Sequence, residues 1–329
     1  MRPGVPTTPV GAHRAQRQPG GSGGSVPTGG PDRVKSTRVI SASMTVWQRI
    51  AAIWRSRELL VYLVRTEIKV KYKNSVLGLL WSLVSPAMTL AVFFVVFQFI
   101  AKNGIPNFVI FLFSGLLLWN LFQTGVQTAT GVVVNNAGIV KKVAFPREIL
   151  ALAAIGSASV FFFFQMIVMV IFMVVLDSPP VWNYLPLLIV ALLAMLVLAS
   201  ALAVFLSAVN VYLRDAQHLV EVLLTALFWM CPIVYSFQLQ LSAKLAHHGL
   251  SALYLMNPIT PLIMTFQKVI YAKEFVRSTV THSTSQILPA WSALTYLEAD
   301  LAVLVFGAVL FVVAIKIFGR LEGNFAEEL

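Results

Sequence analysis

Residues 149–176 read ILALAAIGSASVFFFFQMIVMVIFMVVL, an unbroken stretch of 28 positions without a charged side chain. A helix of roughly 20 apolar residues crosses the ~30 Å hydrocarbon core of a bilayer, so this stretch predicts a transmembrane helix. Soluble domains carry about 25% charged residues, whereas this 329-residue chain carries 11% and is 58% hydrophobic. The composition excludes an ordinary soluble domain and indicates an integral membrane protein.

Five further stretches are long and apolar enough to cross the bilayer. They cover residues 78–101, 108–133, 184–209, 218–237 and 296–318. Residues 253–272 are also apolar, but Pro258 and Pro261 interrupt them, and proline removes a backbone donor that lipid cannot replace. Within 238–272 we therefore expect short re-entrant helices that dip into the outer leaflet and return. The sequence predicts an all-α polytopic protein with six transmembrane helices in a domain covering 75–322.

The basic residues indicate how these spans are oriented. Residues 1–77 contain 13 of the 24 Lys and Arg, and with six spans both termini share a side that holds 19 of the 24. Lys and Arg accumulate on the cytoplasmic side of membrane proteins. Both termini, including the short C-terminus 323–329, are therefore expected in the cytoplasm, and the protein in the inner or plasma membrane. A seventh span at 253–272 is the alternative, and it would move the C-terminus outside.

Two segments precede the first span. Residues 1–45 are rich in Gly, Pro, Ser and Thr, a composition that buries too little apolar surface to fold, and we interpret them as a disordered cytoplasmic tail. Residues 46–74 place Trp47, Trp54 and other apolar residues at helical spacing, with seven cations between them. Such a basic amphipathic helix fits the headgroup layer of an anionic leaflet and argues against nucleic-acid binding. A solvated linker whose cations only set the topology is the alternative.

Uncharged polar residues recur every three or four positions in the 108–133 span, which puts them on one face of the helix. They are Asn120, Gln123, Thr124, Gln127, Thr130 and Gly131. This face either hydrogen-bonds to a neighbouring helix or lines a hydrated path for a polar substrate. Aromatic residues would offer ring faces to sugars along such a path, although packing and interfacial anchoring also favour them. These are Trp119, Phe122, Phe228, Trp229 and Tyr235.

Motifs for nucleotide hydrolysis and metal catalysis are absent from the sequence. It contains no Gly-Lys pair, and hence no P-loop, and no HExxH motif. The single Cys231 excludes an intrachain disulfide and a cysteine-based zinc site. We therefore expect a chain that is not an enzyme and holds no metal or cofactor. A membrane-embedded glycosyltransferase or phosphotransferase is the alternative, and it would need inner-surface carboxylates, for which Glu148, Asp215 and Glu221 are the candidates.

Six patches, in order along the chain, carry a family resemblance. They are LVRTEIKVKYKNSVLGLLWSLVSPA (63–87), KKVAFPREIL (141–150), NVYLRDAQHLV (210–220), CPIVY (231–235), MNPITPL (256–262) and GRLEGNFAEEL (319–329). They resemble the ABC-2 type permeases that export lipid-linked polysaccharides, which include Wzm-type O-antigen and teichoic acid exporters. The resemblance covers 46–329 and implies a homodimeric permease, with ATP and magnesium bound by two copies of a separate Wzt-like ATPase. The Pro/Gly arm and the Ala/Val/Arg-rich composition resemble actinobacterial members and suggest a lipid-linked galactan as substrate.

Carried over by position, the resemblance implies three functional elements. Residues 136–147 resemble a coupling helix that inserts into the ATPase, 46–73 the amphipathic gate helix at the inner leaflet, and 238–272 the outer gate helices. The implied ATPase contacts are Ile139, Lys141, Lys142, Phe145, Pro146 and Arg147. Cations pair strongly with phosphate, and those expected to bind a lipid pyrophosphate are Arg65, Lys69, Lys71, Lys73 and Arg214. An ABC-2 permease for drugs or small lipids is the remaining alternative.

Overall fold

The computed structural model describes residues 45–71, 73, 81–100, 105–242, 247, 249, 251–272, 275–277 and 284–329. The chain divides into two units, Met1–Ala42 and Ser43–Leu329, and every described residue belongs to the second. The expected N-terminal tail, apart from Thr45, lies outside the described residues.

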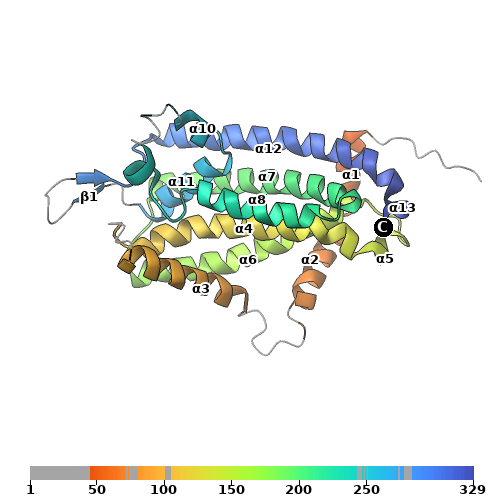
Figure 1. Ribbon diagram of the computed structural model, residues 1–329, viewed down its shortest axis with the longest axis horizontal. Coiled ribbons are helices and arrows are strands. Elements are labelled where there is room, and N and C mark those ends of the chain that lie inside the picture. Colours follow the sequence, from red (N-terminus) through yellow and green to blue (C-terminus); the bar gives the residue numbers. More distant parts are fainter. Residues whose placement is uncertain are drawn as a thin grey trace, which may run out of the picture. The chain divides into compact units, whose positions relative to one another are not determined.

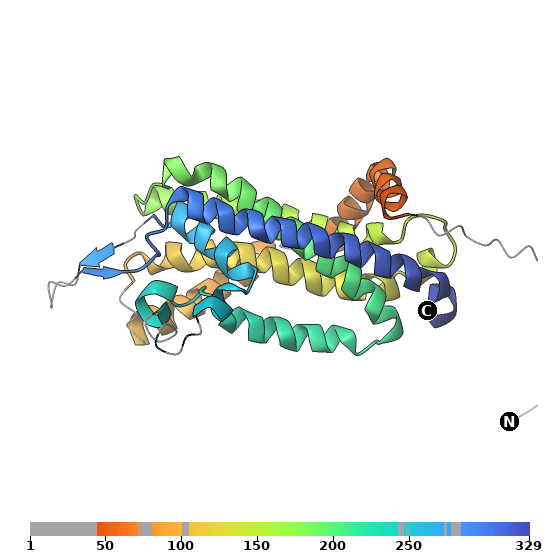
Figure 2. The same ribbon diagram turned by 90° about the horizontal axis from the view of Figure 1, so that it is seen from above.

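Four long apolar helices form the body of this unit. They are α4 (Phe108–Asn135), α6 (Glu148–Val175), α7 (Leu185–Tyr212) and α12 (Ala293–Leu321). All four are long and apolar enough to cross a membrane, and a helix satisfies its backbone hydrogen bonds internally, as lipid requires. The four helices run alongside one another in both views (Figures 1 and 2). They confirm four of the six predicted spans.

The other two predicted spans contain shorter apolar helices. The first contains α3 (Trp81–Phe94) and its π-helical continuation η2 (Val95–Ile100), while residues 78–80 and 101 lie outside the described part. The second contains α8 (Ala216–Met230), which ends at Cys231 because Pro232 cannot continue a helix. Fifteen helical residues cover only about 23 Å. The sequence therefore located both apolar helices correctly but overestimated the length of the second, α8.

The predicted interfacial helix 46–74 is divided in two. Its first part, α1 (Val46–Arg55), begins with a capping box in which Thr45 and Gln48 bond each other's backbone N–H groups. The second part, α2 (Arg57–Lys71), follows after Ser56. The Ser56 N–H donates back to the carbonyls of the preceding turn, and serine competes with helical hydrogen bonding. One continuous helix is thus corrected to two helices with a break at Ser56.

The chain between α8 and α12 forms short elements. They are η4 (Phe237–Leu241), α10 (Ser251–Leu255), α11 (Ile259–Ile270) and an antiparallel hairpin of β1 (Phe275–Arg277) and β2 (Thr284–Gln286). All residues of α11 are buried, and α11 packs against α4, α7 and α12. The sequence did not predict the hairpin, which lies at one end of the bundle (Figure 1). The short helix α5 (Ala137–Val140) and the C-terminal α13 (Phe325–Glu328) lie at the other end.

The long helices differ in what they expose. The central helix α4 is enclosed by its neighbours and contacts α3, α6, α7, α8 and α11. By contrast α6 and α12 expose rows of large apolar side chains, for example Val174 at 76% and Val305 at 62%. Exposed apolar surface of this extent is what lipid-facing helices require. The polar residues of α4 are therefore held inside the protein, where neighbouring helices can share them.

Candidate functional site

A cavity of about 680 Å³ opens between α3, α4, α6 and α8. Among the described residues, its wall combines amide and hydroxyl groups with aromatic rings and includes the cation Lys71. The polar and charged side chains that line it are Lys71, Ser85, Thr89, Asn120, Gln123, Thr124, Gln165 and Thr225. The aromatic ones are Trp81, Phe93, Trp119, Phe161 and Phe228. Pockets for small molecules are usually lined by apolar groups with few polar ones. This cavity has more polar side chains in its wall than such pockets usually have.

The first half of the predicted polar stripe on α4 forms one wall of this cavity. Asn120 Nδ2 donates to Gln165 Oε1 of α6 at 3.2 Å, and Trp119 Nε1 donates to Gln123 Oε1 at 2.8 Å. The interpretation as bonding between helices holds at Asn120, which bonds to α6 and also lines the cavity. Lining of a path for a polar substrate stays a prediction.

Gln165 is a cavity residue that was not predicted from the sequence. It is the only amide side chain of α6, and it is buried beside the cavity. A polar side chain within a membrane span is rare and normally has a partner or a function. That isolated amide, next to four consecutive phenylalanines, was the signal that could have identified it.

Three aromatic rings contact one another on the cavity wall. Phe93 of α3 stacks on Phe228 of α8, with ring centroids 5.7 Å apart and planes inclined by 14°. Trp119 meets Phe228 edge-on at 5.6 Å. Such pairs are worth about 0.5–1.5 kcal/mol beyond the area they bury. The rings thus tie α3, α4 and α8 together around the cavity.

The remaining residues expected to line a path lie elsewhere. Thr130 is fully buried and donates to the Val126 carbonyl at 2.8 Å. Gln127 is half-buried and outside the cavity wall, and Trp229 of α8 is 52% exposed and also outside it. The Tyr235 hydroxyl lies beyond the end of α8, 3.1 Å from the hydroxyl of Tyr254. Helical periodicity correctly predicted which residues share the polar face of α4. It did not predict how far the cavity extends along that face.

Of the five cations expected to bind phosphate, only Lys71 lies on the cavity wall. It is the last residue of α2, and its Nζ lies 4.8 Å from the centroid of the Phe161 ring. All five cations are exposed, and the other four lie outside the cavity wall. These are Arg65, Lys69, Lys73 and Arg214. A cation over a ring face is attracted by the ring quadrupole, which holds the Lys71 ammonium at this position.

The segment expected as a coupling helix is mostly not helical. Only Ala137–Val140 form α5, and the chain from 141 to 147 runs in turns towards α6. Ile139 and Val143 are 47% and 54% exposed, and both neighbouring lysines, Lys141 and Lys142, are exposed as well. The segment therefore presents a mixed apolar and basic surface.

Phe145, Pro146 and Arg147 contact their own chain instead of projecting outward. Phe145 packs against the hydrophobic core, and Pro146 is half-buried. Arg147 Nη1 donates to the Glu322 carbonyl at 2.9 Å, and its guanidinium lies 5.7 Å from the Phe325 ring centroid. The exposed part of the segment thus ends before Phe145.

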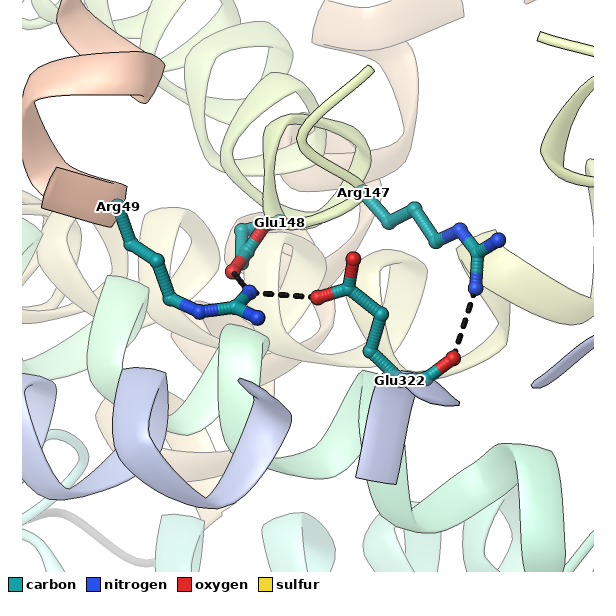
Figure 3. A network of polar contacts seen from close by, with 4 residues as sticks. All are labelled: Arg49, Arg147, Glu148 and Glu322. Atoms are coloured by element: carbon teal, nitrogen blue, oxygen red, sulfur yellow. Dashed lines mark hydrogen bonds and ion pairs between the residues drawn. The ribbon is translucent and has the colours of Figure 1, made fainter. Parts of the chain in front are cut away.

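An ion network connects this segment to α1 (Figure 3). Arg49 Nη1 lies 2.6 Å from Glu148 Oε1 and 2.5 Å from Glu322 Oε2. Burial acts to lower the pKa of Arg49, and hydrogen bonds to Glu322 and Glu148 outweigh it, so its pKa is raised. From the sequence, Arg49 was one of seven cations assigned to lipid headgroups. Its side chain instead turns inward to the two carboxylates.

The three carboxylates that a transferase would need do not form one cluster. Glu148 is paired with Arg49, whereas Asp215, directly before α8, and Glu221, inside α8, are both exposed. Within the described part of the chain, no group of three His, Cys, Asp or Glu is placed to hold a metal ion.

Four apolar helices long enough to cross a bilayer, two of which line a polar and aromatic cavity together with the shorter α3 and α8, are typical of a membrane transport protein. The chain belongs to the ABC-2 type transporter family, whose family model matches residues 58–271. It is 30% identical over 222 residues to the O-antigen export system permease protein RfbA of Myxococcus xanthus, covering 68% of this chain and 84% of that protein. A permease of the same name from Klebsiella pneumoniae is 26% identical over 276 residues, covering 83% and 95%. The family resemblance is confirmed, and the chain is a transport subunit rather than an enzyme.

Proposed function

We propose that the chain is the permease subunit of an ATP-driven exporter that moves a lipid-linked polysaccharide across the plasma membrane. The observation that carries this proposal is the cavity between α3, α4, α6 and α8. Its amide and hydroxyl groups match the hydrogen-bonding groups of a glycan, and its rings offer faces on which sugars stack. The names of the relatives, O-antigen export permeases, support the same substrate class.

The lipid anchor is proposed to carry a pyrophosphate that Lys71 binds at the edge of the cavity. Ammonium and phosphate form charge-assisted hydrogen bonds, which are the strong ones in proteins. Lys71 is the cation that shares the cavity wall with Asn120 and Gln165. The exposed cations outside the wall would then attract the anionic headgroup towards the cavity without holding it there. These are Arg65, Lys69, Lys73 and Arg214.

Energy is proposed to come from a separate Wzt-like ATPase that carries ATP and magnesium. Ile139, Lys141, Lys142 and Val143 form an exposed docking surface for an apolar and acidic groove of that ATPase. In this arrangement two permease chains pair with two ATPases, and both termini lie in the cytoplasm. The basic N-terminal region supports that orientation.

Transport is proposed to follow from movement of the docking surface. This surface lies directly between the end of α4 and the start of α6. The same two helices are joined at the cavity by the Asn120–Gln165 hydrogen bond. A shift of α5 driven by ATP would therefore change the packing of α4 on α6 and open the cavity for the glycan.

The polarity of the cavity favours a glycan over a drug or a small lipid, because a hydrophobic substrate would leave the remaining hydrogen-bonding groups of these amides without partners. Galactan is the proposed polymer, because the Pro/Gly arm and the residue usage of the chain resemble those of actinobacterial members of the family. The test is reconstitution of the chain with its co-purifying ATPase in liposomes. ATP should drive a polyprenyl-pyrophosphate oligosaccharide to the far leaflet. Movement of an apolar drug but not of the oligosaccharide would overturn the proposal.

A further inference from the structure

Arg49 joins three parts of the chain that are far apart in sequence. Its guanidinium bonds Glu148, the first residue of α6, and Glu322, which directly follows α12, while Arg49 itself belongs to α1. In Figure 3 the guanidinium lies between the two carboxylates, with Arg147 on the far side of Glu322. Arg49 thus pairs with both carboxylates, while Arg147 donates to the backbone carbonyl of Glu322.

This network is enclosed rather than a loose surface pair. The side chains of Arg49 and Glu148 are only 15% and 1% exposed. Gly319 of α12 makes room for the guanidinium, because a Cβ there would lie 2.7 Å from Arg49 Nε. Charge-assisted hydrogen bonds shielded from water are strong, and removing one partner leaves an uncompensated charge. Arg49 therefore fixes α1 to α6 and to the end of α12.

The helices α1 and α2 extend from this point to the cavity. Along the way α2 contacts α6 closely at Val64, whose Cγ2 would be 2.7 Å from a Cβ at Gly156. The last residue of α2 is Lys71, over the Phe161 ring on the cavity wall. One end of the α1–α2 pair is thus held by the ion network, and the other end forms part of the candidate substrate site.

The network also adjoins the exposed docking surface. Glu148 follows the turns of residues 141–147 directly, and Arg147 bonds the backbone of Glu322. Any displacement of the docking surface must therefore act on the two residues that hold Arg49. The docking surface and the cavity are connected by a continuous set of contacts through Arg49, α1 and α2, in addition to the path through α4 and α6.

We propose that Arg49 is a positioning residue that transmits movement of the docking surface to α2 and so to Lys71 at the cavity. This inference rests on the proposed function, since it assumes ATP-driven movement at the docking surface. It assigns to α1 a mechanical role that is separate from binding to the membrane surface.

The first experiment separates hydrolysis from transport in the full permease–ATPase complex in liposomes. For Arg49→Gln we expect ATP-driven export of a polyprenyl-pyrophosphate oligosaccharide to fall about tenfold or more, with ATPase activity within about twofold of wild type. Arg55→Gln is the matched control, because Arg55 lies on the same helix, is exposed and forms no ion pair within the described residues. Export by Arg55→Gln should stay near wild type. Unchanged export by Arg49→Gln would overturn the inference.

Exchanging the charges of Arg49 and Glu322 distinguishes loss of the ion network from simple unfolding of the variant. Arg49→Glu places three acids together and should abolish export, whereas Arg49→Glu combined with Glu322→Arg puts a cation between two carboxylates again. Glu322 suits this exchange because its side chain is 26% exposed. We expect the double variant to recover at least about half of the export, as coupled residues show non-additive effects. A double variant that assembles and hydrolyses ATP but does not export would contradict the inference.

A spin label gives a readout that a purely structural role would leave unchanged. Tyr62 of α2 is 64% exposed, and Tyr62→Cys in a Cys231→Ala background offers a single labelling site. We expect ATP to change the mobility of the label in the otherwise wild-type complex and not in Arg49→Gln. An equal response in both would overturn the inference. If the wild-type complex itself neither binds an ATPase nor exports the oligosaccharide, the proposed function fails instead.

Discussion

Lys71 Nζ lies 4.8 Å from the centroid of the Phe161 ring, where the last residue of α2 meets the wall of the cavity. The contact joins a helix of the N-terminal amphipathic region to a transmembrane helix. It also distinguishes Lys71 from Lys69, two residues earlier, which lies outside the cavity wall. Lys71 and Lys69 have the same chemistry, so any difference between them in function must come from position.

Lys71→Ala should therefore weaken use of the lipid-linked substrate much more than Lys69→Ala. Loss of a hydrogen bond to a charged group costs about 1.5–3 kcal/mol, which corresponds to roughly tenfold or more in apparent affinity. The measurement is the substrate concentration that gives half-maximal stimulation of ATPase activity in the reconstituted complex. Equal effects of the two substitutions would refute the placement of the phosphate at Lys71.

The Asn120–Gln165 pair tests whether the polar stripe serves transport or only packing. Gln165→Leu leaves Asn120 without its partner on α6, yet hydrogen bonds between membrane helices average only about 0.6 kcal/mol. We expect a small decrease in the unfolding temperature and a large decrease in export. Asn120→Leu combined with Gln165→Leu should restore thermal stability and leave export low. Recovery of export in the double variant would show that the pair acts through packing alone.

The close contact of α2 with α6 depends on the missing side chain at Gly156. Gly156→Ala places a methyl group 2.7 Å from Val64 Cγ2, and overpacking of this kind costs about 1–3 kcal/mol. Both thermal stability in detergent and export should decrease. Val64→Ala in the same chain removes the clashing methyl groups and should recover most of the loss. Failure of Val64→Ala to compensate would argue that α2 does not pack here.

The docking surface makes a prediction about assembly. Ile139→Asp puts a charge on an exposed apolar position and should reduce co-purification of the ATPase at least about tenfold, because buried unpaired charge at an interface is strongly unfavourable. The thermal stability of the permease alone should not change. Leu213→Asp is the control, since Leu213 is similarly exposed but lies between α7 and α8. Wild-type recovery of the ATPase with Ile139→Asp would contradict the assignment.

Phe145 is expected to behave differently from Ile139. The sequence suggested that Phe145 inserts into a partner, but its ring packs against the hydrophobic core of this chain. Phe145→Ala should lower the thermal stability of the isolated permease, since truncating a buried phenylalanine costs about 3–5 kcal/mol and this half-buried ring should cost less. Loss of ATPase binding without any loss of stability would instead favour direct insertion.

The sequence predicted the features that depend on short-range pattern. Hydropathy located α4, α6, α7 and α12, because a bilayer sets the length of an apolar helix. A spacing of three to four residues placed Asn120 and Gln123 on one face. Length was misjudged for α8, where the apolar character continues past Cys231 although the helix does not. Hydropathy depends only on composition, so it does not show that the helix ends at Met230.

Features that depend on distant contacts could not be predicted from the sequence. Nothing local to Arg49 distinguishes it from Arg55, and its role emerges only when residues 148 and 322 come together. The same holds for Lys71 among the other cations of α2. Gln165 is an intermediate case, since its isolation in an apolar helix marks it, while its partner comes from another helix. Tertiary packing decides which member of a repeated residue type is used.

The most direct test of the central claim is export by purified components. Liposomes should contain the permease, its co-purifying ATPase and a polyprenyl-pyrophosphate oligosaccharide in one leaflet, and arrival of the glycan in the other leaflet should be followed with and without ATP. We predict arrival only when both proteins and ATP are present, and no ATP hydrolysis by the permease alone. Hydrolysis of ATP by the isolated permease, or ATP-independent arrival of the glycan, would contradict the claim that this chain is a conduit powered by a separate subunit.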